Sequence, residues 1–252
     1  MCLVLVAWRN HPEYPLVVAA NRDEFYQRPT APAAFWPDHP QLLAGRDLEA
    51  GGTWLGITRQ GRFAALTNFR DPTRQQPQAP SRGRLVADFL TGDRAIDDCL
   101  DSLDASACNG FNLLLGDGEK LVAFSNVSNE RHELEPGIYG LSNALLDTPW
   151  PKVGAGKTAL EAALNALPDE HRLWALLRDD RTHPDDALPA TGVPLEWERL
   201  LSAAFVLSPD YGTRSSTILT LSAGTAVTFD EQTWLAGGVA GGRVRFRFSL
   251  SR

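Results

Sequence analysis

The order of its strand-like and helix-like segments limits the fold of this chain more than any other feature. Apolar runs rich in β-branched and aromatic residues predict strands, and apolar residues at helical spacing predict helices. In chain order the predicted segments are strands at 2–8, 16–20, 53–59 and 62–68, a helix over about 83–104, a hairpin at 111–126, a strand at 137–143, helices over about 151–166 and 169–179, and strands at 204–207, 214–222, 225–230 and 243–249. A doubly wound parallel sheet needs strands and helices that alternate regularly, and this order does not. We therefore expect an α+β fold of mostly antiparallel sheets covered by helices, in one domain over residues 1–252.

Local signals refine this outline. Asp117-Gly118 is a strong turn signal between two apolar runs, so it predicts the turn of the hairpin. The last strand, "RVRFRFS", alternates strictly, which places its arginines on one face and Val244, Phe246 and Phe248 on the other. The Pro-rich segment 29–40 is expected to be an ordered loop, as are 182–194 and Gly237–Gly242.

Composition excludes several classes of function. The 252 residues carry a formal net charge of −7, whereas a general nucleic-acid binder needs a basic face, so we expect no nucleic-acid partner. The apolar run 2–8 is too short to span a membrane, and we expect no integral membrane segment. The three cysteines (Cys2, Cys99 and Cys108) have neither a disulfide framework nor zinc-site spacing. This favours a cytoplasmic protein with no metal site and no cofactor.

The first candidate for chemistry is Cys2. If the initiator methionine is removed, as is usual before a small residue, Cys2 carries both a thiol and a free α-amine. These groups have pKa values of about 8.5 and about 7.7–8.0 in model compounds, so the amine can act as base for the thiol. Alternation places Cys2, Val4 and Val6 on one face of the first strand. The alternative is a small apolar residue that begins a strand.

The second candidate is the polar cluster Asn21, Arg22, Asp23 and Glu24. If the first two strands form a hairpin, the start of one lies beside the end of the other, so we expect the cluster next to Cys2. A carboxylate there would orient the amine, and an arginine would favour the thiolate. On a regular strand Asn21 and Asp23 share one face, and Arg22 and Glu24 share the other. The alternative is a charge cluster that closes a sheet edge.

Further polar residues stand at the ends of predicted strands. Asn143 ends one strand, where its amide can donate to a developing oxyanion. Asn68 and Arg70 end another, and Arg214 precedes a long one, where it can bind a carboxylate or assist a thiolate. The alternatives are asparagines in turns and arginines at the surface.

The segment "GAGKT" at 154–158 resembles part of a P-loop, but it does not support nucleotide binding. The motif requires a glycine at position 151, where this chain has Pro151. The segment also follows Pro-Trp-Pro where a P-loop follows a strand. The start of a helix explains it more simply.

Several long motifs carry a resemblance to a known family. They are "MCLVLVAW", "ANRDEFYQRPT", "LAGRDLEAGGTWLGI", "FAALTNFRDP", "SRGRLV", "YGLSNALLDTPWPKV" and "YGTRSST". Together they resemble the NRDE family, also called the transport and Golgi organisation protein two family, over essentially the whole chain. The resemblance implies an N-terminal nucleophile (Ntn) hydrolase-like fold, a four-layer αββα sandwich with two mostly antiparallel sheets.

The resemblance also implies roles for individual residues. The family is similar to the cysteine amidases of the choloylglycine hydrolase and penicillin V acylase group, whose pattern has an N-terminal cysteine, an arginine and an aspartate on the second strand, two asparagines and a late arginine. Cys2 matches the nucleophile, Asn143 and Asn68 are similar to the two asparagines, and Arg214 is similar to the late arginine. The second strand departs from Arg-x-x-Asp, so Arg22 and Asp23 would fill these roles in a shifted register.

Two functions follow as expectations. The first is a cysteine-dependent hydrolase of a linear amide or related C–N acyl bond. Its catalytic residues would be Cys2, Arg22, Asp23, Asn143 and Arg214, and its substrate-binding residues Asn21, Glu24, Asn68, Trp54 and Arg70.

The second expected function is a non-catalytic binding and trafficking protein for haem or an acyl-CoA-like lipid on the same scaffold. The family is associated with haem mobilisation and with lipid metabolism. Aromatic residues near the predicted strand ends would wall a pocket for such a ligand, among them Trp36, Trp54 and Trp150.

Overall fold

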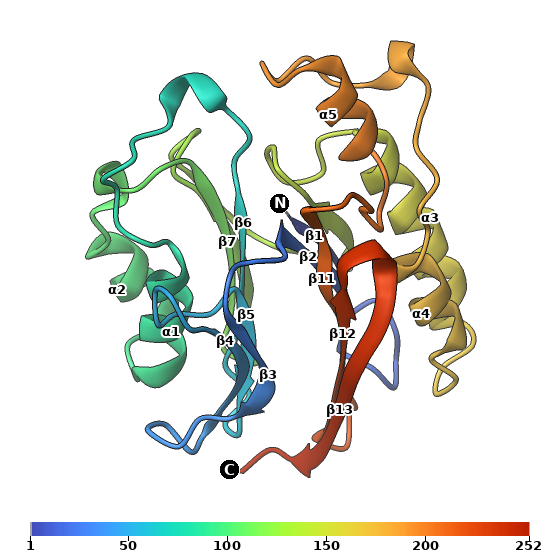
Figure 1. Cartoon of the computed structure of the whole chain (residues 1–252). Helices are drawn as coiled ribbons and strands as arrows, with labels where there is room; N and C mark the ends of the chain where they lie inside the picture. Colours follow the sequence, from blue (N-terminus) through green and yellow to red (C-terminus); the bar gives the residue numbers. More distant parts are fainter. Residues whose placement is uncertain (1, 252) are drawn as a thin grey trace.

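A computed structural model describes residues 2–251. Met1, whose removal the amine mechanism requires, and Arg252 lie outside the described residues. Two antiparallel β-sheets lie face to face, and helices cover the outer face of each (Figure 1). The layer order αββα confirms the α+β fold class and the four-layer sandwich that the resemblance implies.

The two sheets have six and seven strands. The six-stranded sheet has the spatial order β10 (Gly137–Leu141), β1 (Cys2–Trp8), β2 (Leu16–Phe25), β11 (Tyr211–Leu221), β12 (Ala226–Leu235) and β13 (Val239–Ser249). The seven-stranded sheet has the order β3 (Thr30–Phe35), β4 (Leu42–Asp47), β5 (Leu55–Thr58), β6 (Phe63–Asn68), β7 (Phe111–Gly116), β8 (Leu121–Ser125) and β9 (Glu130–Glu133). The helices are α1 (Gly83–Thr91), α2 (Ile96–Asp101), α3 (Pro151–Leu164), α4 (His171–Leu177) and α5 (Leu195–Leu200).

Three apolar layers hold the sandwich together. The residues of β1 are buried on both faces: Val4 and Val6 pack between the sheets, and Leu3 and Leu5 pack against α3 and α4. A third layer lies between the seven-stranded sheet and the helices α1 and α2. This arrangement explains why the first strand reads as a continuous apolar run, which is typical of a strand covered on both sides.

The C-terminal strand follows its predicted alternation. Val244, Phe246 and Phe248 pack on the layer between the sheets. On the opposite face Arg243 and Arg245 bind the buried carboxylate of Asp230. The Asp117-Gly118 turn is also confirmed, and Gly118 has a φ of 94°, which favours glycine.

Two predictions in the N-terminal half are wrong. Residues 29–40 are not all loop, because β3 occupies Thr30–Phe35 at the edge of its sheet. An edge strand tolerates Pro32, and the register of β3 shifts beside it. The single helix over about 83–104 is two helices, because Gly92 ends α1 and α2 begins at Ile96. Glycine is a poor helix former, which accounts for the break.

Three more differences lie elsewhere. Residues 204–207 form no strand and contribute one isolated bridge, between Leu207 and Gly212. The expected loop Gly237–Gly242 is mostly strand, because β13 starts at Val239 after a tight turn. The short elements β4, β9 and α5 have no counterpart in the predicted segments.

Within residues 2–251, none of the helices combines the length and the apolar content of a membrane span. The cytoplasmic location stays a prediction.

Candidate active site

The N-terminal hairpin brings Cys2 to the end of β2. Strands β1 and β2 pair antiparallel as predicted, and Cys2 lies directly opposite Arg22. Strand β2 continues through the polar cluster to Phe25, because β11 pairs with it along its whole length. The cluster therefore ends a central strand, which removes the alternative of charges that close a sheet edge.

Alternation along β2 divides the cluster between the two faces of the sheet. The even-numbered residues of the strand face the other sheet, and the odd-numbered residues face the helices. Arg22 and Glu24 therefore share the face of the Cys2 side chain, and Asn21 and Asp23 lie on the opposite face.

A cavity of about 470 Å³ opens between the sheets at this point. Four residues that lie opposite one another on adjacent strands of the six-stranded sheet line one wall of the cavity: Cys2, Arg22, Ser215 and Thr233. The opposite wall comes from the seven-stranded sheet and the segment before α1, and includes Asp47, Thr53, Trp54, Asn68 and Arg82. The volume lies in the range of small-molecule sites, about 300–1,000 Å³.

Cys2 lines this cavity from a nearly buried position. Its surface is 7% exposed. Burial raises the pKa of the thiol above its ordinary value, Asp23 and Glu24 act in the same direction, and Arg22 opposes them. A thiol in this setting is protonated at neutral pH and needs a base or a nearby cation to react as a thiolate.

Asp23 also borders the cavity, although its carboxylate belongs to the helix side of the sheet. The Thr213 hydroxyl donates to this carboxylate at 2.8 Å, and the Tyr211 hydroxyl donates to the Asp23 main-chain carbonyl at 3.1 Å. Burial raises the pKa of the carboxyl, and Lys152 is the strongest of the cations that oppose the rise. Asp23 is thus held rigidly beside the start of β1.

Asn21 does not line the cavity. Its amide nitrogen donates to the carbonyls of Leu177 at 2.9 Å and Ala204 at 2.7 Å, and its oxygen accepts from the Ser216 hydroxyl at 2.6 Å. The side chain is fully buried and joins the sheet to the chain around α4 and α5. The substrate-binding role predicted for Asn21 does not fit this position, because both polar atoms of its buried side chain are engaged within the protein.

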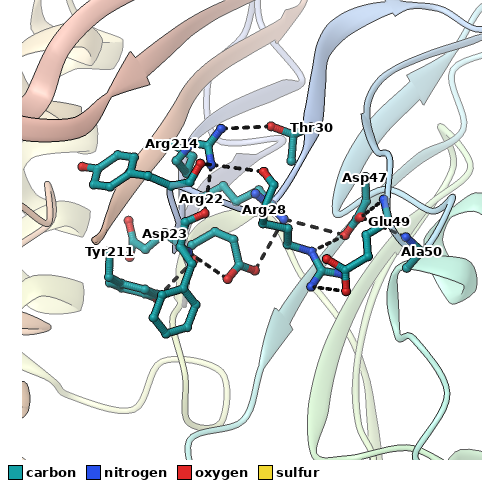
Figure 2. A network of polar contacts seen from close by, with 12 residues as sticks. Arg22, Asp23, Arg28, Thr30, Asp47, Glu49, Ala50, Tyr211 and Arg214 are labelled. Carbon is teal, nitrogen blue, oxygen red and sulfur yellow. Dashed lines mark hydrogen bonds and ion pairs between the residues drawn. The ribbon is translucent and has the colours of Figure 1, made fainter. Parts of the chain in front are cut away.

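Arg22 and Glu24 belong to a charge network that links the two sheets (Figure 2). The guanidinium of Arg22 lies 3.5 Å from Glu24 and 3.9 Å from Asp47 of the other sheet. Asp47 accepts a shorter bond, 2.8 Å, from Arg28, and this bond keeps the pKa of Asp47 below its ordinary value although burial opposes it. Both Arg22 contacts are longer than a charged hydrogen bond, about 2.7–2.9 Å, so Arg22 can engage a ligand at little cost.

Arg214 binds the chain that follows β2 (Figure 2). Its Nη1 donates to the carbonyls of Phe25, Tyr26 and Arg28 at 2.9, 2.8 and 3.2 Å. A β-bulge in β11 at this residue turns the side chain toward that segment. Arg214 borders the cavity and shapes its wall, but its Nη1 is engaged by main-chain carbonyls, and its Nη2 lies 3.4 Å from the Thr30 hydroxyl.

Asn68 and Asn143 lie together, and of the two it is Asn68 that lines the cavity. Asn143 is fully buried; its amide nitrogen donates to the Asn68 carbonyl at 2.9 Å, and its own carbonyl accepts from the Arg70 N–H at 2.7 Å. The preceding Ser142 hydroxyl donates to the Cys2 carbonyl at 3.0 Å. Asn143 and Ser142 therefore position Asn68 and Cys2.

Of the last two predicted substrate-binding residues, Trp54 and Arg70, one lines the cavity and the other does not. Trp54 borders the cavity. Arg70 lies behind it, with Nη1 2.6 Å from a Glu198 carboxylate oxygen and its guanidinium 4.6 Å from the centre of the Trp150 ring. Arg70 and Glu198 form a buried ion pair, and neither residue lines this cavity.

Comparison with known proteins identifies the chain. Residues 1–236 match the family model described as Transport and Golgi organisation 2. The chain belongs to this family. The Transport and Golgi organization protein 2 homologue of Bos taurus is 40% identical over 262 residues, covering 93% of this chain and 94% of the relative. The homologue of Homo sapiens is 38% identical over 259 residues, with the same coverage.

The solved structure of another protein has the same fold as this Transport and Golgi organisation 2 family member. The Caenorhabditis elegans N-acylethanolamine-hydrolyzing acid amidase orthologue superposes with a TM-score of 0.53 at 12% identity, over 86% of this chain and 92% of the amidase. At this identity the likeness concerns the fold alone, which is the Ntn-hydrolase-like sandwich.

Sequence patterns missed three charged residues of the site. Arg82 and Glu231 line the cavity, and Lys152 lies buried behind Cys2. Arg82 stands in "SRGRLV" and Lys152 in "DTPWPKV", within two of the segments that carried the family resemblance, and their presence there could have indicated a role in the site. Glu231 carried no local signal, because only tertiary packing buries it.

Glu231 makes the stability of this family member depend on pH. Its carboxylate accepts from the Ala33 N–H at 2.7 Å, yet burial raises its pKa from 4.5 to about 7. Between these values the native state holds a proton that the unfolded state has lost, so the free energy of unfolding falls as the pH rises. We expect Glu231→Gln to remove this fall, which amounts to about 3 kcal/mol.

Urea denaturation at pH 5 and pH 8 measures this effect. Glu161→Gln, a change at an exposed position of α3, is the matched control and should retain the pH dependence of the unaltered protein. A fall of equal size in Glu231→Gln and in the unaltered protein would show that Glu231 is already ionised at pH 5.

Proposed function

We propose that this protein hydrolyses a linear amide or a related C–N acyl bond with Cys2 as nucleophile. The observation that supports this most is the position of Cys2 at the start of a central strand, lining a 470 Å³ cavity directly opposite Arg22. The Ntn-hydrolase-like scaffold supports the same proposal, because the start of β1 lies where the cavity opens between the two sheets (Figure 1).

In the proposed mechanism Cys2 supplies both nucleophile and base. After removal of Met1, the α-amine takes the thiol proton, directly or through a water molecule, and the thiolate attacks the carbonyl carbon. The side chain of Asn68, whose main-chain carbonyl is held by the Asn143 amide, donates to the oxyanion, and Arg22 stabilises the negative charge beside the thiolate. Asp23 orients the amine.

The intermediate then collapses in two steps that conserve protons. The C–N bond breaks as the Cys2 ammonium gives its proton to the leaving amine, and the acyl group remains on sulfur as a thioester. Water attacks this thioester while the amine accepts a proton from it. The acid leaves, the thiolate takes the proton back, and Cys2 returns to its starting state.

A panel of linear N-acyl amides tests the proposal. The purified protein, shown by intact mass to lack Met1, is incubated with amides of varied acyl length and amine, and release of primary amine is measured. We expect turnover of at least one class of these amides. No release from any of them by a protein with a free Cys2 would contradict the proposal.

Arg82 favours a second candidate function, binding of haem or an acyl-CoA-like lipid. Its one hydrogen bond to a described residue is from Nη1 to the Gly110 carbonyl at 2.9 Å, and no carboxylate of residues 2–251 forms an ion pair with it. It can therefore bind a carboxylate or phosphate. Cys2 is the single cavity-lining residue among the described ones with a side chain of the types that hold haem iron axially.

Titrations with haem and with a long-chain acyl-CoA separate the two functions. A stoichiometric Soret shift, or saturable acyl-CoA binding that weakens in Arg82→Gln, together with no amide turnover, would favour the binding protein. Turnover without saturable binding of either ligand would exclude it.

A further inference from the structure

A group of buried charges lies on the helix side of the hairpin, directly behind Cys2. Its members are Asp23, Arg70, Lys152 and Glu198, each of which is buried. They come from four separate parts of the chain: the end of β2, the segment after β6, the first turn of α3 and the helix α5. Burying four charges is costly, and such groups are frequent where a protein adjusts the protonation of a reacting group.

Lys152 is the member of this group whose burial is not explained by an ion pair among the described residues. Its Nζ donates to the Leu201 carbonyl at 2.8 Å, and no carboxylate among the described residues lies within ion-pair distance. Burial lowers its pKa to about 8, and Asp23 is the strongest of the groups that oppose this. The next lysine of α3, Lys157, is partly exposed, with 31% of its side-chain surface accessible, and pairs with Asp147 at 2.8 Å.

The charges of this group balance before any charge from Cys2 is added. Arg70 and Glu198 form a direct ion pair, and Lys152 is the strongest of the cations that act on the carboxylate of Asp23. An additional ammonium on the terminus of Cys2 would be the third cation beside two carboxylates in a buried region. In such a region repulsion between like charges favours the neutral amine.

The other groups that act on Cys2 come from the remaining elements around it. They are Arg22 and Glu24 of β2, Tyr211 of β11 and Arg82 before α1. Arg22 and Glu24 carry opposite charges on the cavity face, and they act on the pKa of the Cys2 thiol in opposite directions. Lys152 is thus a buried cation with no carboxylate of residues 2–251 at ion-pair distance, and Asp23 is the strongest of the acidic groups that act on it.

We infer that Lys152 is a positioning residue, which, through its charge beside Asp23, keeps the α-amine of processed Cys2 in the neutral form that can take the thiol proton. This inference rests on the proposed function for the role of the amine. Lys152, in the first turn of α3, would then set the pH range in which Cys2 reacts.

The pH profile of Cys2 alkylation tests this inference without any substrate. Lys152→Met and the unaltered protein are reacted with iodoacetamide between pH 5 and pH 10, and modification of the N-terminal peptide is followed by mass spectrometry. Removal of a buried cation makes loss of the first proton from Cys2 harder, so the apparent pKa should rise. A rise of about one unit slows alkylation at pH 7 by up to about 10-fold, and the profiles converge at high pH.

Two further variants make the test specific. Lys157→Met removes a partly exposed lysine from the same helix and should leave the profile unchanged. Asp23→Asn removes the carboxylate, so the apparent pKa should fall; this opposite shift is measurable even if Lys152→Met does not fold. Lys152→Arg should restore the original profile if the charge is what matters.

The outcomes separate this inference from the proposed function. An unchanged profile in a folded Lys152→Met variant overturns the inference, whether or not the protein hydrolyses amides. A shifted profile in a protein that hydrolyses no amide supports the inference about Cys2 and contradicts the function. Retention of Met1 on the purified protein overturns both the inference and the amine mechanism.

Discussion

Replacing Cys2 by alanine is expected to lower amide hydrolysis by at least about 10³-fold, because the change removes the atom that forms the acyl bond. Neither Arg22 nor Asn68 can attack a carbonyl in its place. The loss should appear in kcat, measured as release of primary amine. Alanine fits the strand start and leaves the nearby apolar packing intact, so the melting temperature should change little.

The other two cysteines supply matched controls. Cys99 and Cys108 are free, pack on the outer side of the seven-stranded sheet, and do not line the cavity. Cys99→Ala and Cys108→Ala should keep full turnover. Equal activity of Cys2→Ala and the unaltered protein would mean that another group performs the chemistry.

Replacing Glu198 by alanine is expected to cost about 3–5 kcal/mol of unfolding free energy, the largest stability effect of any single side chain in the site. The side chains of Arg70 and Glu198 are only 2% and 3% exposed and lie 2.6 Å apart. Removal of the carboxylate leaves the Arg70 cation buried without its partner. It also removes the acceptor for the Thr191 hydroxyl and N–H, which hold the segment before α5.

Urea denaturation measures this loss against a surface pair in the same part of the chain. Arg199 and Asp185 pair at 2.6 Å, but their side chains are 47% and 52% exposed. Asp185→Ala should cost less than about 1 kcal/mol, because water replaces the lost contact. A similarly small loss in Glu198→Ala would show that water reaches Arg70 or that the pair contributes little.

Much of the fold could be predicted from local patterns. The N-terminal hairpin, the Asp117-Gly118 turn and the alternation of the last strand each depend on neighbours in sequence, and each is confirmed. Short elements such as β3 and α5 could not be predicted in this way. Their few residues take their conformation from the sheet edge or helix layer on which they pack.

The candidate site shows the same division. Hairpin geometry placed Cys2 beside the polar cluster, and the period of a strand correctly separated Asn21 and Asp23 from Arg22 and Glu24. Which pair faces the cavity depends on the packing of the sheets, and so required the structure. Arg214 donates to main-chain carbonyls because of a β-bulge in β11, and no local sequence pattern predicted this bulge.

The most direct test of the account is to trap the acyl group on the enzyme. The protein is mixed with an N-acyl anilide, quenched in acid within one turnover and digested, and the peptides are examined by mass spectrometry. We expect the acyl group as a thioester on the peptide that begins with Cys2, and we expect it to disappear on further incubation as the acid is released. Complete turnover with Cys2 unmodified, or an acyl group on another residue, would contradict it.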